Sequence, residues 1–227
     1  MFRILTGSDY DEVMYLQPSK LCRYLICPKM SKIELFNRLD FSQNTEGSKQ
    51  AMYMGSWLHK MYYEKNGNTV NNLLLKEIRK HYGKVLQKQI LIERIKVILR
   101  GKFDNLEINP VLGTVSVVEG KTTGKGRLTT RELSAALFQL QIYLFILKPI
   151  LNNLGWELDK YHYLEIYDQN TYTMMKRIEV EEDMETEEMI KEIVKSFLGL
   201  SPMMLPPSYI CKRCPRQVKS ICGRTSK

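Results

Sequence analysis

Hydrophobic residues recur at three- and four-residue spacing in several parts of the chain, and this spacing predicts helices. Three such segments, 19–25, 51–64 and 70–82, lie in the N-terminal part of the sequence. A fourth covers 185–198, and acidic residues gather around its start, where they suit the positive end of a helix dipole. Helices are therefore expected towards both ends of the chain.

Short runs of β-branched residues predict strands in the middle of the chain. Residues 95–100 and 113–118 are bounded by Gly, Asn and Pro, and the segment 105–110 between them has the composition of a turn. Two further candidates, 161–167 and 172–180, are joined by a polar Asp-Gln-Asn link. These strands lie on both sides of a longer helical segment.

The most apolar part of the sequence, 133–151, belongs to a helix that is predicted over 130–148 and is expected to end at Pro149. Its length is close to that of a membrane span, but Gln139 and Gln141 interrupt it, which favours a buried helix. The N-terminus carries early acidic residues and no uninterrupted apolar run, so it does not resemble a signal peptide. A cytoplasmic protein without a membrane segment is expected.

Strands, a long helix and then more strands predict an α/β fold with helices packed on a sheet. The 227 residues, 44% of them hydrophobic, suit a single domain over 1–227 with its core at about 50–180. This composition excludes disorder, a collagen-like chain and a coiled coil. Residues 201–227 show no clear period and contain prolines and closely spaced cysteines, which favours a loop held by a metal.

Positive charge is concentrated in two segments. The chain has 34 Lys and Arg against 25 Asp and Glu, a net charge of +9. Residues 79–102 hold eight basic residues and one acidic residue, and residues 206–227 hold six bases and no acid. Two such segments could follow a phosphate backbone, although solvated helix faces explain them equally well.

Two acidic residues and a lysine follow the first two predicted strands. Asp104 comes after 95–100, whereas Glu119 and Lys121 come after 113–118. If these strands are neighbours, Asp104 and Glu119 meet at one sheet edge, and Lys121 points to the same face as Glu119. Paired carboxylates suit Mg²⁺ or Mn²⁺, and a neighbouring lysine could polarise a phosphate or orient a water. The combination indicates phosphodiester hydrolysis.

Three more residues could complete this site. His59, upstream, would add an imidazole ligand and would favour Mn²⁺ over Mg²⁺. Gln139 and Tyr143 are four positions apart on the predicted long helix, so both project from one face, where they could hold the nucleic-acid backbone or the lysine. Each residue alone has an ordinary structural explanation, and the order and spacing of the whole set carry the argument.

The motifs resemble those of RecB-like nucleases of the PD-(D/E)XK superfamily, over residues 50–145. They are Gly55-x-x-x-His59, Gly101-x-x-Asp104, Glu119-x-Lys121 and Gln139-x-x-x-Tyr143. The resemblance implies a restriction-endonuclease-like fold with a mixed sheet flanked by helices. It implies that His59, Asp104, Glu119 and the carbonyl of Gly120 bind the catalytic metal, that Lys121 is catalytic, and that Gln139 and Tyr143 support the site. Gly120 departs from the family, where this position is usually apolar.

Five cysteines are too few for a disulfide scaffold in a chain of this length, so their spacing indicates metal binding or plain thiols. Cys211, Cys214 and Cys222 lack one ligand for a four-thiolate site, which the distant Cys27 could supply. Zinc and an iron–sulfur cluster are both open on this reasoning. Cys22 is the remaining thiol. It is expected to be a packed residue of a helix, and it is the alternative ligand if Cys27 does not bind the metal.

One Cys-Pro before the nuclease motifs and three cysteines after them resemble the iron–sulfur branch of the same family, which includes CRISPR-associated RecB-like exonucleases. The resemblance implies that Cys27, Cys211, Cys214 and Cys222 hold an iron–sulfur cluster, 4Fe–4S in preference to 2Fe–2S. This cluster would join the Cys27 region to residues 201–227. The gap between Cys214 and Cys222 is longer than the family pattern.

The resulting expectation is an Mn²⁺- or Mg²⁺-dependent deoxyribonuclease that acts as an exonuclease on single-stranded DNA during CRISPR spacer acquisition. CRISPR integrase proteins and a second copy of the chain are further expected partners. A recombination, repair or virus-encoded nuclease of the same family would carry the same motifs. Two other classes stay open: a non-catalytic DNA-binding subunit with a structural metal site, and a Cys₄ zinc-binding interaction protein.

Overall fold

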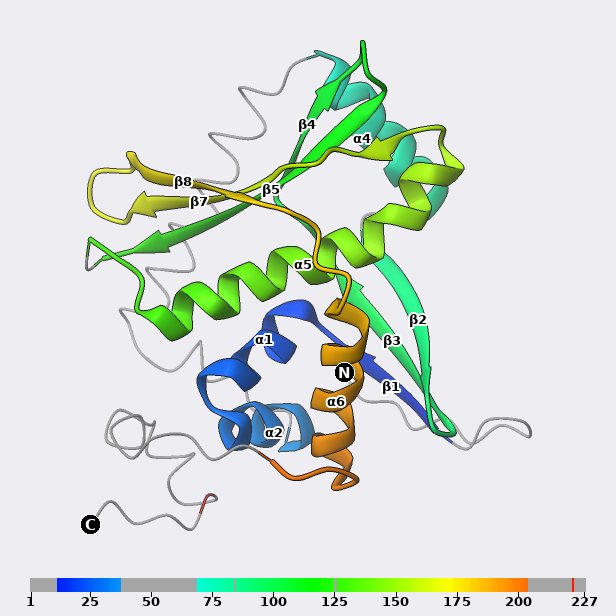
Figure 1. The fold of residues 1–227 in the computed structure, drawn as a ribbon, viewed down its shortest axis with the longest axis vertical. Coiled ribbons are helices and arrows are strands. Elements are labelled where there is room, and N and C mark those ends of the chain that lie inside the picture. The colour runs from blue at the N-terminus through cyan, green and yellow to red at the C-terminus, as the bar shows by residue number, and fades with distance from the viewer. Residues whose placement is uncertain (1–11, 38–68, 84, 125, 204–221, 223–227) are drawn as a thin grey trace.

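Two β-sheets and a long helix between them organise the molecule (Figure 1). The computed structural model describes residues 12–37, 69–83, 85–124, 126–203 and 222. The described helices are α1 (Pro18–Ile26), α2 (Pro28–Asn37), α4 (Thr69–Tyr82), α5 (Thr130–Asn153) and α6 (Thr186–Leu198). The strands are β1 (Glu12–Leu16), β2 (Leu86–Ile92), β3 (Ile95–Gly101), β4 (Asn105–Asn109), β5 (Thr114–Thr123), β6 (Glu157–Leu158), β7 (His162–Asp168) and β8 (Met174–Val180).

The first sheet has three strands in the order β1-β3-β2. β1 pairs with β3 in parallel, and β2 pairs with β3 as an antiparallel hairpin. Alternate residues of each strand are buried, among them Leu16, Leu86 and Leu99, so one face of this sheet belongs to the core. The opposite face is polar or half-buried apart from Leu91, which is exposed.

The second sheet has the order β4-β5-β7-β8, with the short β6 beside β5. β5 and β7 run parallel, and α5 connects them, as a parallel pair requires a crossover connection. The pairs β4–β5 and β7–β8 are antiparallel. The structure is therefore a mixed α/β fold, with two sheets flanked by helices in place of one continuous sheet.

Helix α5 forms the centre of the core. Its N-cap, Thr129, forms a capping box with Glu132, and the helix then buries most of its residues between the five-stranded sheet on one side and α1 and α6 on the other (Figure 1). By length and composition α5 could cross a membrane, but 61% of its apolar window is buried inside the protein. This confirms the prediction of a buried helix.

The predicted end of this helix at Pro149 is wrong, because α5 continues to Asn153. A proline inside a helix leaves the carbonyl four residues earlier without its amide donor. Here that carbonyl belongs to Phe145, and Nζ of Lys88 on β2 donates to it at 2.9 Å. The buried residues Ile150 and Leu151 then continue the apolar face beyond the proline.

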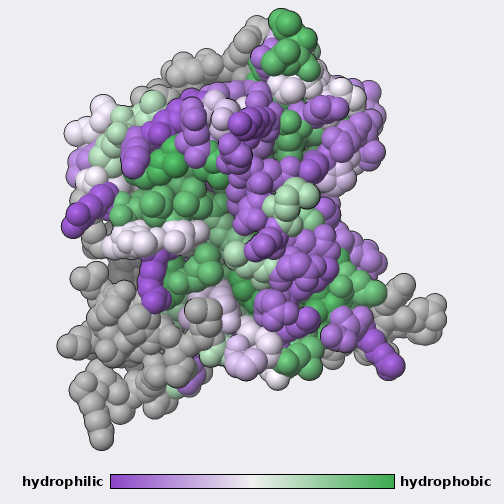
Figure 2. Space-filling view, in the orientation of Figure 1, coloured by the Kyte–Doolittle hydropathy of each residue, from purple (hydrophilic) through white to green (hydrophobic). Residues whose placement is uncertain are grey.

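The predicted turn at 105–110 is also wrong, because Asn105–Asn109 is strand β4. Leu106 is fully buried beneath β5 whereas its neighbours are half-exposed, so the segment has the period of a strand despite its asparagines. The chain turns only after Asn109. Figure 2 shows a hydrophobic cap over this turn, where Val111 and Leu112 are 90% and 69% exposed.

Strands β1 and β2 were not predicted. β2 lies in the basic segment 79–102, where Lys and Gln alternate with buried Leu86, Ile90 and Ile92. The predicted helices 19–25, 70–82 and 185–198 are confirmed to within a few residues as α1, α4 and α6. The predicted helix 51–64 lies outside the described residues.

Candidate active site

Asp104 lies between β3 and β4, directly beside β5. The register pairs Asn105 of β4 with Val118 of β5, so Asp104 stands opposite the following residue of β5, Glu119. The Oδ2 atom of Asp104 accepts a hydrogen bond from the backbone N–H of Gly120 at 2.8 Å. Glu119 lies close enough to Asp104 to affect the pKa of its carboxyl group. The expected pair of carboxylates is present.

Strand β5 places Glu119 and Lys121 on the face that packs against α5. The Glu119 side chain is 2% exposed and that of Lys121 is 28% exposed. Nζ of Lys121 donates to Oε1 of Glu119 at 2.6 Å. β5 is longer than the predicted strand 113–118, and its extension to Thr123 is what fixes this pair on a rigid strand.

Helix α5 brings Gln139 and Tyr143 to the same place. Nζ of Lys121 also donates to Oε1 of Gln139 at 2.9 Å, and Nε2 of Gln139 donates to the hydroxyl of Tyr143 at 3.2 Å. Both helix residues are buried. A hydrogen-bonded array therefore links Glu119, Lys121, Gln139 and Tyr143, and Asp104 joins it through the backbone N–H of Gly120 on the same strand. The array connects the sheet to the helix.

Burial sets the protonation of this array. Removal from water raises the pKa of Asp104 to about 6, although Lys121 and the Gly120 amide act in the opposite direction. Burial lowers the pKa of Lys121, but the charges of Glu119 and Asp104 outweigh burial and the pKa is raised overall. Lys121 therefore stays protonated at neutral pH. Burial also raises the pKa of the Tyr143 hydroxyl, which stays neutral.

Two cavities open beside the array. A small one of about 20 Å³ is lined by Asp104, Arg79 and Lys102 and has room for about one water molecule. A larger one of about 670 Å³ is lined by Tyr143, Gly101 and, again, Lys102. Lys102 borders both cavities, so its side chain lies between the larger cavity and Asp104.

Gly101 allows Tyr143 to lie where it does. A Cβ atom at position 101 would fall 2.8 Å from the Tyr143 ring and 2.9 Å from Cγ of Pro18, closer than real Cβ contacts. The glycine is part of the motif that led to Asp104, but its contact with the tyrosine could not be predicted from spacing. Lys102 was likewise missed as a site residue, although it lies inside the same four-residue motif.

The donor set suits a hard divalent cation. Asp104 and Glu119 offer carboxylate oxygens within one buried site. Gly120 follows Glu119 directly on β5, and its backbone carbonyl is the further oxygen that the sequence predicted as a ligand. The third predicted side-chain ligand, His59, lies outside the described residues, as does Gly55. Within the described ranges, no cluster of three His, Cys, Asp or Glu side chains occurs.

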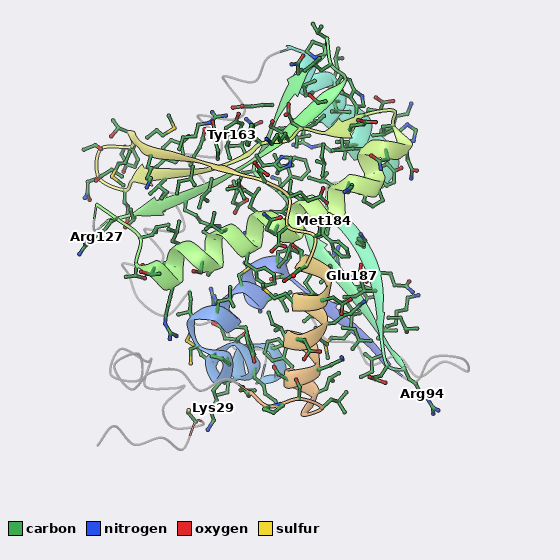
Figure 3. All side chains as sticks on the ribbon, in the orientation of Figure 1. Lys29, Arg94, Arg127, Tyr163, Met184 and Glu187 are labelled. Carbon is green, nitrogen blue, oxygen red and sulfur yellow. The ribbon has the colours of Figure 1, made fainter. Side chains whose placement is uncertain are left out.

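The predicted cysteine module is described only in part. Cys27 is buried at the end of α1, and Cys211 and Cys214 lie outside the described residues. Nζ of Lys29, which is labelled in Figure 3, donates to the backbone carbonyl of Cys222 at 2.6 Å. Cys222 therefore lies beside Lys29, two residues after Cys27.

Cys22 is buried in the core on α1, as predicted for the spare thiol. Burial raises its pKa well above the usual value, and the charges of Lys121 and Glu119 also act on it. Cys22 is thus a neutral thiol of the core near Lys121 and Glu119.

No family model and no curated protein sequence matches this chain. Its fold is similar to that of the solved protein SSO0001, with a TM-score of 0.53 and 17% identity over 91% of this chain and 84% of that one. It is also similar to a protein from Eubacterium rectale that carries the provisional name exonuclease, with a TM-score of 0.51 and 13% identity over 94% and 89% of the two chains. The chain therefore has a mixed α/β fold of the kind found in a protein named as a nuclease.

Proposed function

We propose that this protein is a metal-dependent deoxyribonuclease of the RecB-like type. The hydrogen-bonded array from Asp104 to Tyr143 is the observation that carries the proposal. Residues from three separate segments form the array: the β3–β4 link, β5 and α5. A stable α/β core does not need two carboxylates and a lysine to be buried together, and their burial is costly. Such a costly arrangement is typical of a functional site.

Asp104, Glu119 and the carbonyl of Gly120, with His59, would hold Mn²⁺ or Mg²⁺. A bound cation of this kind would make a coordinated water more acidic and would neutralise charge on the scissile phosphate. Asp104 and Glu119 fit this role because their shared burial disfavours two negative charges without a counter-ion.

Lys121 would act as a fixed positive charge in this reaction. Because its pKa is raised, the ammonium does not serve as a general base and instead donates hydrogen bonds. Its donors to Glu119 and Gln139 hold Nζ in one position, from which a remaining N–H can reach a phosphate oxygen or a water molecule. Gln139 and Tyr143 orient the lysine, so they are positioning residues.

We further propose that the substrate is single-stranded DNA cleaved from an end, and that the protein trims DNA during CRISPR spacer acquisition with integrase proteins as partners. The motifs that resemble CRISPR-associated RecB-like exonucleases support this part. Self-association and a cytoplasmic location belong to the same proposal.

The direct test is cleavage of end-labelled single-stranded DNA in the presence of Mn²⁺, Mg²⁺ or a chelator. We expect metal-dependent degradation by the wild-type protein and by Lys148→Ala, a surface lysine that serves as control, but none by Lys121→Ala. The label position gives the polarity. Salt-sensitive DNA binding without cleavage under any metal would contradict the nuclease proposal and support a non-catalytic DNA-binding subunit.

We also propose that Cys27, Cys211, Cys214 and Cys222 hold an iron–sulfur cluster, of the 4Fe–4S type. The support from the fold is that Lys29, just after Cys27, contacts the carbonyl of Cys222. We expect visible absorbance and bound iron in the protein, both lost in Cys214→Ser. Bound zinc with no iron would instead support a Cys₄ zinc site.

A further inference from the structure

The larger cavity leads away from the active site along the edge of the three-stranded sheet. It has a volume of about 670 Å³, within the range of pockets that bind small ligands. Tyr143 and Gly101 border it near the active-site array, and Tyr15, Gln87 and Arg100 line it further along β1, β2 and β3. We call this cavity the strand groove.

The register of the sheet explains which side chains enter the groove. Tyr15 on β1 pairs with Ile98 on β3, and Arg100 lies two residues further along β3 and opposite Gln87 of β2. Residues two apart on a strand point to the same face, so Tyr15, Gln87 and Arg100 share the face that the core does not use. Tyr15 is half-buried, whereas Arg100 is exposed.

The groove carries positive charge that the described part of the protein does not neutralise. Arg100 and Lys102 are both exposed, and neither forms an ion pair with a carboxylate among the described residues. Lys102 reaches both cavities, and Arg79 on α4 borders the small cavity together with Asp104. The basic side chains therefore continue from the groove to the carboxylates of the active site.

We propose that the strand groove binds the nucleotides of a single DNA strand next to the bond that is cleaved. Tyr15 stacks against a base, and Arg100 and Lys102 contact successive phosphates, with Lys102 nearest the active site. An aromatic side chain flanked by basic residues along a groove is the arrangement by which proteins bind single strands without reading their sequence. This inference rests on the proposed nuclease function, because it gives that site its substrate path.

The geometry favours a single strand over a duplex. A base can stack on the Tyr15 ring only when it is not already stacked and paired within a helix. The ring is also half-buried in a concavity rather than raised on a convex surface, so a flexible strand reaches it more easily than a rigid duplex does.

The test measures binding of a fluorescein-labelled oligothymidine to the full chain by anisotropy, in chelator so that no cleavage occurs. The variants are Tyr15→Ala, Tyr15→Phe, Arg100→Ala and Lys102→Ala. Arg94→Ala is the matched control, since Arg94 is exposed in the β2–β3 turn, at the far end of the hairpin from the groove (Figure 3). It removes the same charge without touching the groove.

We expect Tyr15→Ala to weaken binding by about 5- to 150-fold, as for the loss of one stacked base, and Tyr15→Phe to restore it. Arg100→Ala and Lys102→Ala should each lower the slope of log affinity against log salt by about 0.7, as for one lost phosphate contact. Arg94→Ala should bind as the wild type does. If Tyr15→Ala does not fold, the two exposed basic positions carry the test.

The proposal would be overturned if all groove variants bound the oligonucleotide with the affinity and salt slope of the wild type. It would also be overturned if an unlabelled duplex of the same length competed for the protein as well as an unlabelled single strand does. Absence of DNA binding by the wild-type protein would overturn it as well. The cleavage assay with Lys121→Ala is read separately, so metal-dependent cleavage with normal binding by the groove variants rejects the groove alone. Weakened binding without any cleavage rejects the nuclease and keeps the groove as a binding site.

Discussion

Replacement of Lys121 by methionine should destabilise the fold as well as abolish cleavage. The ammonium donates a hydrogen bond to Glu119, and its charge also lowers the pKa of Asp104. Its removal takes a positive charge away from two buried carboxyl groups at neutral pH. Methionine fills nearly the same volume, so the loss is one of charge and hydrogen bonding rather than of packing.

The expected loss is about 3 kcal/mol. Removal of one partner from a fully buried ion pair costs about 3–5 kcal/mol, and the 28% exposure of Lys121 places this pair near the lower limit. For a domain of this size, that free energy corresponds to a decrease in Tm of about 6–12 °C. Differential scanning calorimetry at pH 8 in chelator measures it.

The loss should depend on pH and on metal. The pKa of Asp104 is about 6 in the intact protein and should rise when Lys121 is removed. At pH 5 Asp104 is then protonated, which should relieve part of the repulsion between the carboxylates, so the Tm deficit of the variant should be smaller than at pH 8. Addition of Mn²⁺ should stabilise the variant more than the wild type, because the cation replaces the missing charge.

Lys148→Met is the matched control, since Lys148 pairs with Glu182 at 2.7 Å with side chains 43% and 29% exposed. An exposed pair contributes about 0–1 kcal/mol, so this variant should melt within about 4 °C of the wild type. If Lys121→Met melts like Lys148→Met at pH 8, or if its deficit is the same at pH 5, then Lys121 does not neutralise buried carboxylates and the reasoning fails.

Gly101→Ala should displace the Tyr143 ring and reduce cleavage, and overpacking should lower the free energy of unfolding by about 1–3 kcal/mol. An unchanged denaturant midpoint together with an unchanged cleavage rate would show that the ring has room to move. Lys88→Met should cost about 1–3 kcal/mol in urea unfolding, because Lys88 donates to the Phe145 carbonyl that Pro149 leaves without its usual helix donor. Pro149→Ala in the same chain should recover part of this loss, and additive effects of the two changes would argue against the link. Burial lowers the pKa of His162 to about 4, so the unfolded chain binds a proton below pH 6.5 and the folded one does not. Stability should therefore fall by up to about 3 kcal/mol between pH 6.5 and 4, and His162→Asn should flatten that part of the curve; parallel curves for the two proteins would contradict the buried neutral imidazole.

Most of the hydrogen-bonded array was predictable from the sequence because four of its members lie on one strand and one helix. Glu119 and Lys121 are two apart on a strand and Gln139 and Tyr143 are four apart on a helix, so local geometry already places each pair on one face. The core helix was predictable for a similar reason, since its apolar length exceeds what a surface helix needs. The resemblance to a nuclease family then supplied the link between the two pairs.

Other features depend on contacts that the sequence does not display. The helix passes Pro149 because Lys88, far away on β2, replaces the missing donor. The turn assigned to 105–110 is a strand because β5 pairs with it, and this pairing brings Asp104 to Glu119. The strand groove forms where β1 pairs with β3. Tyr15 and Arg100 belong to no sequence motif, so their spacing along the chain did not predict the groove.

The parallel pairing of β1 with β3 has a consequence for synthesis of the protein. Glu12 pairs with Ile95, so β1 leaves the ribosome long before its neighbour exists, by about 4–16 s at ordinary rates of translation. During that interval Met14 and Leu16, which the finished core buries, have no sheet to cover them. The β5-α5-β7 unit, by contrast, is nearly contiguous in the chain and can close as soon as it emerges. The half of the site that holds Glu119, Lys121 and Gln139 can thus assemble early, whereas the strand groove can form only after β3 has been made and has paired with β1.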